Sequence, residues 1–268
     1  ASILRSANIA YVKWDMNRQL TDLGSGVLPV EKQGELLHRY VLGVYELQER
    51  LITEFPQLLL ENCSGGGARF DPGMLYYSPQ IWCSDDTDAI ERLEIQEGTA
   101  LIYPLCSMGA HVSVCPNHQS GRTTPFETRG IVASAGTFGY ELDLMKMSEE
   151  EKKTAREQIL KYKEMEHLVQ SGDYYRLVNP FENNNHVRWQ FVSKDKKETV
   201  VCGVRLHSEA NPYIYLFYPQ GLDADMKYED TATGKVYTGA ALMKAGLPLP
   251  LTTGDYQPIR FTFKAVEK

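Results

Sequence analysis

The sequence lacks long apolar runs and lacks an excess of positive charge. None of its 268 residues lies in a stretch approaching the ~20 consecutive apolar residues that a membrane-spanning helix needs. No signal-peptide pattern opens the chain. Its 28 Lys and Arg face 35 Asp and Glu, which gives a net charge of −7 and argues against a polyanionic partner. We therefore expect binding neither to a membrane nor to nucleic acid.

Cysteine is scarce and has no metal-ligand spacing. The five cysteines are an odd number with no obvious pairing scheme, so reduced thiols and a cytoplasmic location are the simpler interpretation. His111 and His118 flank Cys115, but this spacing matches no zinc pattern. We expect structural polar contacts there and predict no metal site.

A dinucleotide-binding fingerprint is also missing, because no GxGxxG follows a predicted strand. What is present up to about residue 170 is an alternation of strand and helix patterns. The predicted strands are Ser6–Asp15, Leu58–Cys63, Gln80–Ser84, Ser107–Val112 and Gly139–Asp143, and the predicted helices are Val30–Glu54, Thr87–Pro104, Thr128–Ala135 and Ser148–Gln170. Such alternation indicates a parallel sheet. Five strand–helix units fit part of a (β/α)8 barrel, with a doubly wound open sheet as the competing architecture.

The pattern changes near Gly172. Strand-length runs without an apparent helix follow, at Val187–Val192, Thr199–His207, Tyr213–Pro219 and Ile259–Ala265. The sequence therefore predicts an α/β chain of two domains. Residues 1–171 form the barrel part, and residues 172–268 form a C-terminal antiparallel β-sandwich.

Polar clusters follow three of the predicted strands. The first strand ends in Asp15, the second runs into the turn Ser64–Gly67, and the third ends just before Asp85. Because active residues of barrels lie at the carboxyl ends of the strands, these carboxylates can face one another. Such a pair suits glycoside hydrolysis, in which one carboxylate attacks the anomeric carbon and the other protonates the leaving oxygen. The structural alternative is that Asp85 or Asp88 only caps the next helix.

Four segments resemble those of glycoside hydrolase family 36 α-galactosidases. They are YVKWDMNR (Tyr11–Arg18), LLLENCSGGGARFD (Leu58–Asp71), QIWCSDDTDAIER (Gln80–Arg92) and GAHVSVCPNHQSGR (Gly109–Arg122). Their order and spacing make the resemblance specific. It covers most of the barrel part and continues more weakly through the sandwich.

The resemblance implies a role for seven residues. The Asp of the KWD run, Asp15, matches the family's nucleophile, and Asp85 matches its acid/base. The positions that match the lining of the family's galactose subsite are Lys13, Asn17, Cys63, Gly66 and Trp82. This sequence departs from many relatives at Asp86, where we expect Asn. The chemistry that the resemblance implies requires neither a metal nor a cofactor.

Alternatives remain for several of these residues. Cys63 is also compatible with a buried structural thiol. The glycine turn is compatible with a tight turn alone, although not with a P-loop, since no Gly-Lys-Ser/Thr follows it. Lys13, two residues from Asp15 on the same strand face, is expected to supply the cation that an ionised nucleophile needs. Trp14 and Trp82 offer apolar faces to a sugar ring.

The resemblance implies a retaining exo-α-galactosidase that acts on α-galactosides such as melibiose and raffinose. Alternatives are an α-N-acetylgalactosaminidase, a galactosyl-transferring relative, or a non-catalytic carbohydrate-binding or scaffold fragment. Family enzymes are much longer, so we expect this chain, which starts at Ala1, to correspond to a segment from about the fourth barrel strand onward. A homo-oligomer, or complementation by the preceding part, is expected to cover its open sheet edge.

Overall fold

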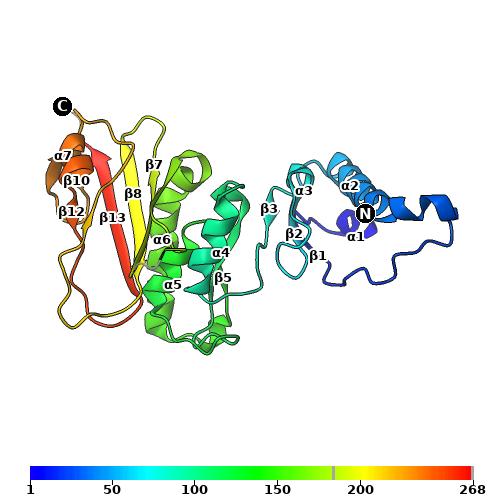
Figure 1. Ribbon diagram of the computed structural model, residues 1–268, viewed down its shortest axis with the longest axis horizontal. Helices are drawn as coiled ribbons and strands as arrows, with labels where there is room; N and C mark the ends of the chain where they lie inside the picture. Colours follow the sequence, from blue (N-terminus) through cyan, green and yellow to red (C-terminus); the bar gives the residue numbers. More distant parts are fainter. Residues whose placement is uncertain (183–184, 267–268) are drawn as a thin grey trace. The chain divides into compact units, whose positions relative to one another are not determined.

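The computed structural model describes residues 1–182 and 185–266 (Figure 1). Residues 183, 184, 267 and 268, which fall inside the predicted sandwich, lie outside the described part. The contacts of the chain divide it into two compact units, one from Ala1 to Asp85 and the other from Asp86 onward. The predicted boundary between residues 171 and 172 stays a prediction.

The first unit is a three-stranded parallel sheet with helices. Its elements are α1 (Ser2–Ser6), β1 (Tyr11–Asp15), the 3₁₀ helix η1 (Val30–Glu35), α2 (Leu36–Glu54), β2 (Leu59–Cys63), α3 (Pro72–Tyr77) and β3 (Gln80–Ile81). The strand order is β1-β2-β3. The register sets Asp15 opposite Cys63, so the polar clusters of two strands meet at the carboxyl ends of the strands.

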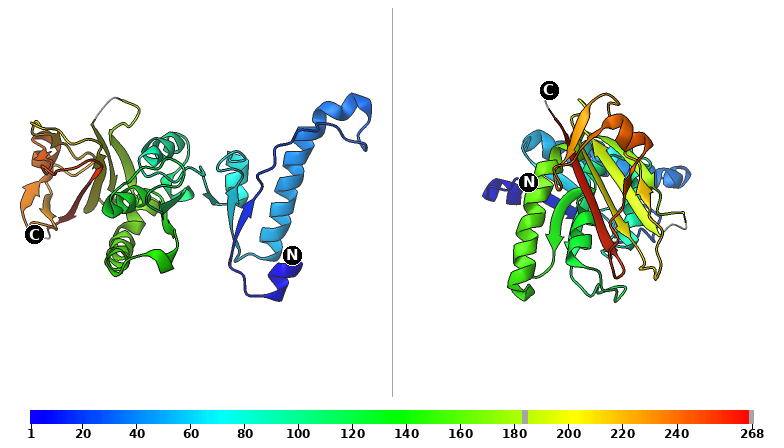
Figure 2. Two further views of the ribbon diagram at one scale, coloured as in Figure 1. Left: turned by 90° about the horizontal axis from the view of Figure 1, so that it is seen from below. Right: turned by 90° about the vertical axis from the view of Figure 1, so that its left-hand side faces the viewer.

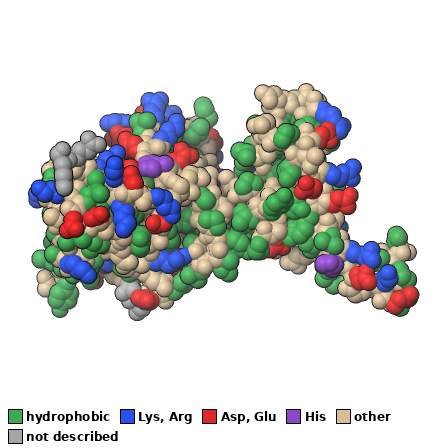
Figure 3. Space-filling view, turned by 90° about the horizontal axis from the view of Figure 1, so that it is seen from above, with side chains coloured by type: hydrophobic (Ala, Val, Ile, Leu, Met, Phe, Trp, Pro, Cys, Tyr) green, Lys and Arg blue, Asp and Glu red, His purple; other side chains and the backbone are tan. Residues whose placement is uncertain are grey.

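Much of the apolar surface of this unit is exposed. Strand β1 pairs only with β2, which leaves its other edge without a ladder partner among the described residues. Apolar side chains with between 45 and 57% of their surface exposed include Tyr11, Leu37, Leu42, Leu47 and Leu59. On the face drawn in Figure 3, apolar side chains are exposed among charged and other polar ones.

The second unit begins with a further parallel pair. Strands β4 (Gly109–Ser113) and β5 (Thr137–Glu141) pair in parallel. The accompanying helices are α4 (Glu91–Ala100), η2 (Leu105–Ser107), α5 (Phe126–Ala133), η3 (Leu144–Lys146) and α6 (Glu149–Ser171). Helix α6 begins with the capping box that Ser148 and Glu151 predict, and both of its reciprocal hydrogen bonds are present.

The chain then forms a six-stranded antiparallel sheet in the order β11-β10-β13-β8-β7-β6. Its strands are β6 (Asp173–Val178), β7 (His186–Val192), β8 (Glu198–Arg205), β10 (Lys227–Asp230), β11 (Val236–Thr238) and β13 (Gln257–Ala265), while β9 (Leu216–Phe217) and β12 (Leu247–Pro248) pair separately. Helices α5 and α6 pack on strands of this sheet (Figure 2). An apolar core that includes Val201, Phe217, Leu242 and Phe263 holds the sheet against β9 and α7 (Gly239–Lys244).

The structure differs from the sequence prediction in several elements, among them the unpredicted helices α1 and α3 and the predicted strand Ser6–Asp15, of which only Tyr11–Asp15 is a strand. Of the predicted strand Tyr213–Pro219, only the two residues of β9 are in a strand, and Tyr213 and Ile214 are largely exposed. The six-residue helix α7 stands where no helix was predicted, because Thr238 caps it. The predicted helix from Thr87 is shorter, since it begins at Glu91. Among the described residues, no helix is both long enough and apolar enough to cross a membrane.

Candidate active site

Asp15 lies at the exposed end of β1, held by the residue two positions on. Asn17 donates from Nδ2 to Asp15 Oδ2 at 2.9 Å. The other end of the Asn17 amide, Oδ1, accepts the backbone N–H of Gly65 at 2.6 Å. Asn17 therefore links the predicted nucleophile to the glycine turn after β2 and fixes the orientation of its own amide.

Lys13 shares the face of β1 on which Asp15 lies. Its Nζ is 3.5 Å from Oε1 of the buried Glu61 and 4.6 Å from the ring centroid of Trp82. Trp82 is only 3% exposed, so its ring packs beneath the ammonium group. Lys13 thus contacts Glu61 and Trp82, and it lies two residues before Asp15 on the same strand.

The turn Ser64–Gly67 joins the ends of all three strands. The Ser64 hydroxyl donates to the Met16 carbonyl at 2.5 Å, beyond the end of β1. Gly66 has φ +83°, and a Cβ placed on it would lie 2.8 Å from Ser84 Cα and 3.3 Å from the Asp85 backbone nitrogen. Only glycine permits this approach. The turn thus places the backbone before Asp85 against the end of β2.

Cys63 is 3% exposed and its side chain faces this site. Burial raises the pKa of the Cys63 thiol, and the nearby Asp15 carboxylate acts in the same direction. The backbone N–H of Gly66 and the charge of Lys13 oppose that rise in pKa. The thiol is accordingly kept protonated, as an uncharged group beside Asp15.

Asp85 and Asp88 have different surroundings. Asp85 is exposed. Asp88 is 2% exposed, accepts the backbone N–H of Ile90 at 2.8 Å and pairs with Arg122 at 2.6 Å. Burial alone would raise the pKa of Asp88, but bonds from Ser120, Ile90 and Arg122 bring it below its usual value. Asp88 thus binds backbone N–H groups where α4 begins, as a structural role requires, although Ile90 and not Asp88 is the N-cap residue of that helix.

Asp86, where the family resemblance led us to expect Asn, has a local structural contact. Its Oδ1 accepts the backbone N–H of Asp88 at 2.9 Å. An asparagine oxygen accepts the same bond, so this contact does not require a carboxylate.

Three further side chains that form contacts in this site were not predicted from the sequence. Glu61 binds Lys13, Ser64 bonds across to Met16, and Arg69 donates to carbonyls at the ends of β1 and β2. All three lie within the segment that resembles the family. Their positions in that segment could have marked them as site residues. Their contacts could not be predicted locally, because the partners, except for Cys63, lie 48 or more residues away in sequence.

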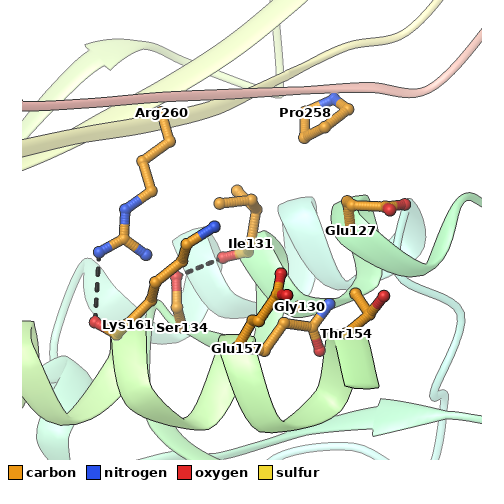
Figure 4. A pocket seen from close by; sticks show the side chains of 10 residues that line it. Glu127, Gly130, Ile131, Ser134, Thr154, Glu157, Lys161, Pro258 and Arg260 are labelled. Atoms are coloured by element: carbon orange, nitrogen blue, oxygen red, sulfur yellow. Dashed lines mark hydrogen bonds between the residues drawn. The ribbon is translucent and has the colours of Figure 1, made fainter. Parts of the chain in front are cut away.

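The second unit has polar clusters of its own. His111 lies 3.8 Å from Glu141, and no group of three or more potential metal ligands occurs in the part of the chain that the structure describes. A cavity of about 270 Å³ lies between α5, α6 and β13, with Glu127, Lys161 and Arg260 in its lining (Figure 4). It contains none of the predicted site residues.

The comparison with protein families identifies the class. Residues 1–172 match the melibiase family, and residues 186–263 match the glycosyl hydrolase family 36 C-terminal domain. The first match covers more than half of the chain. The chain therefore belongs to the melibiase family, in the form that carries the family 36 C-terminal domain.

Particular relatives are similar along the whole chain. The chain is 50% identical over 268 residues to alpha-galactosidase AgaA of Geobacillus stearothermophilus, covering 100% of this chain and 36% of that protein. It is 48% identical over 264 residues to alpha-galactosidase Mel36A of Lactobacillus acidophilus, covering 98% of this chain and 36% of that protein. The chain thus spans little more than a third of the length of these relatives.

Solved structures show the same fold. An alpha-galactosidase from Lactobacillus brevis superposes with a TM-score of 0.97 at 43% identity, over 100% of this chain and 37% of that one. A variant of AgaA in complex with raffinose superposes with a TM-score of 0.96 at 49% identity, over 99% and 37%. The predicted fold class, part of a (β/α)8 barrel followed by a C-terminal β-sandwich, is confirmed.

Proposed function

We propose that the chain carries the catalytic carboxylates of a retaining exo-α-galactosidase, with Asp15 as nucleophile and Asp85 as acid/base. One observation carries the proposal. Asp15 ends β1, Asp85 follows β3, and the Ser64–Gly67 turn at the end of the intervening strand β2 contacts the backbone of Met16, next to Asp15, and of Ser84, next to Asp85. Two carboxylates on strands that flank a third can face one another, as the two carboxylates of double displacement do.

The reaction follows from this arrangement. Asp15 attacks the anomeric carbon of the galactosyl group while Asp85 gives its proton to the leaving oxygen. Water, deprotonated by Asp85, then releases galactose from the glycosyl-enzyme with retained configuration. This mechanism expects the two carboxyl groups roughly 5–5.5 Å apart.

Other residues of the site hold the reactants. Asn17 keeps Asp15 oriented through its 2.9 Å bond. Lys13, Cys63, Gly66 and Trp82 are proposed to line the galactose subsite. In the family that the chain resembles, the loop from Cys63 to Gly66 faces the 2-position of the sugar, where a bulky N-acetyl group would need more room than a hydroxyl. Galactosides are therefore preferred to N-acetylgalactosaminides.

The substrates are proposed to be raffinose-type galactosides, since a relative is described in complex with raffinose. All five cysteines are free thiols, which fits the proposed cytoplasmic location. The proposal also includes a domain boundary near residues 171 and 172 and a partner that is either a second copy of the chain or a complementing segment. It includes neither a nucleic acid nor a membrane among the partners.

Activity toward p-nitrophenyl α-D-galactoside tests the proposal. We expect release of p-nitrophenol by the chain and its loss in Asp15→Asn, while Asp22→Asn, at an exposed carboxylate of the same unit, retains it.

Addition of azide distinguishes the two carboxylates. Asp15→Gly lacks the nucleophile, so azide should displace the leaving group directly and form the β-galactosyl azide. Asp85→Ala keeps Asp15, so azide should attack the glycosyl-enzyme and form the α-galactosyl azide. Exchange of these two products would reverse the assignment.

The second candidate function is a non-catalytic carbohydrate-binding segment. It is favoured by the exposure of both Asp15 and Asp85 in this chain. Binding of galactose by calorimetry, with no p-nitrophenol released by folded protein, would support it over the enzyme.

A further inference from the structure

Arg69 lies where β1 and β2 end. Its Nη2 donates to the Trp14 carbonyl at 3.1 Å and to the Cys63 carbonyl at 2.9 Å. The two acceptors belong to different strands. One directly precedes Asp15, and the other directly precedes the Ser64–Gly67 turn.

The guanidinium is well suited to this place. A charged donor makes shorter and stronger hydrogen bonds than a neutral one. Arg69 Nε is shielded from solvent and has no hydrogen-bond partner within the described residues, so the group is partly desolvated and its two bonds gain in strength. The Cys63 carbonyl also accepts the Met16 N–H at 3.1 Å. Arg69 therefore reinforces a junction that already links the two strands.

The geometry transmits this contact to the reacting groups. The Trp14 carbonyl and the Asp15 nitrogen share one rigid peptide plane, so fixing the carbonyl orients the backbone from which the Asp15 carboxylate projects. In the same way, the bond from Arg69 to the Cys63 carbonyl fixes the peptide plane that leads from Cys63 into the glycine turn. A displacement of about 1 Å at a reacting group costs on the order of 100-fold in rate.

We propose that Arg69 is a positioning residue for the reaction, which holds the nucleophile strand β1 and the glycine turn in one arrangement by bonding to both backbones. This inference rests on the proposed function. It assigns Arg69 no contact with substrate, so its loss should act through Asp15 and the turn.

Arg69→Ala tests the inference, with Arg69→Lys as the conservative variant. The matched control is Arg260→Ala, because Arg260 also donates from Nη2 to a backbone carbonyl, that of Lys161 at 3.2 Å, in the other unit. In Arg69→Ala we expect kcat for p-nitrophenyl α-galactoside to fall about 10- to 100-fold with KM changed less than about threefold. Arg69→Lys and millimolar guanidinium added to Arg69→Ala should each restore part of kcat.

An unchanged kcat in Arg69→Ala would overturn the inference, and so would a loss that guanidinium and Arg69→Lys both fail to restore. Amide hydrogen exchange supplies a readout that needs no turnover. The Met16 N–H should exchange faster in Arg69→Ala than in Arg260→Ala, and equal rates would count against the positioning role. If the unsubstituted chain is folded but inactive, the proposed function fails while the exchange rates still decide the inference.

Discussion

At the scale of single residues, the missing side chain of Gly66 allows the glycine turn to lie close to the backbone beside Asp85. Its φ is positive, and a Cβ placed on it would lie against the backbone of Ser84. Gly65 next to it has a positive φ of 55° but open space around a Cβ. An alanine at Gly65 would therefore introduce backbone strain alone, whereas an alanine at Gly66 would add a steric clash with Ser84.

Gly66→Ala is expected to lower kcat at least tenfold and to lower the melting temperature, because the methyl group would lie 2.8 Å from a backbone atom beside Asp85. Gly65→Ala should cost only the left-handed strain of about 1–2 kcal/mol. Melting curves and p-nitrophenol release compare the two variants. Equal losses in both would show that the contact with Ser84 has no part in the site.

At the scale of elements, local signals predicted the long helices well and the short helices and strands poorly. Helix α6 begins where its capping box indicates, because the cap depends only on Ser148 and Glu151. The aromatic run after Tyr213 looked like a strand but mostly is not. Its residues make side-chain contacts, such as the Tyr215 hydroxyl to Glu209 at 3.1 Å, in place of a ladder.

Ser148→Ala should destabilise the second unit by about 1 kcal/mol, because it removes the cap of α6. That corresponds to a shift of roughly 2–4 °C in melting temperature for a unit of this size. Ser171→Ala is the control, since the Ser171 hydroxyl donates to the His167 carbonyl of its own helix, at the exposed last turn. Thermal unfolding by circular dichroism measures both, and equal shifts would argue against a special role of the cap.

At the scale of the whole molecule, stability should depend on pH through His186. Burial lowers the pKa of His186 to about 4, with help from Arg188 and Arg205 and with Glu209 opposing. In the unfolded chain the pKa is near 6.5. Between these values the unfolded state binds more protons, so the free energy of unfolding falls as pH is lowered from 6.5 toward 4.

The slope from this one residue is at most about 1.4 kcal/mol per pH unit. Urea midpoints between pH 7 and 4.5, followed by fluorescence of the buried Trp189 in the same strand, measure it. His186→Gln should flatten the profile, whereas His38→Gln, at an exposed position, should leave it unchanged. A profile identical in His186→Gln and the parent would refute the assignment.

Exposed apolar surface on the first unit should make the chain self-associate. Tyr11 and Leu59 lie on β1 and β2, and Leu42 on α2, and each exposes 45% or more of its surface. Sedimentation velocity should show species above 30.4 kDa, with less association in Leu42→Glu. A monomer at all concentrations would contradict this, and would also weaken the proposed need for a complementing partner.

The sequence by itself determined the polar strand ends, the helix periodicities and the cap of α6, because these depend on neighbours a few residues apart. The roles proposed for Asp15 and Asp85 came from motif resemblance. Only the tertiary structure decided that Asn17 meets Gly65 and that Gly66 packs on Ser84. Strand register and turn geometry bring these residues together across long stretches of chain, and no periodic pattern in the sequence records such contacts.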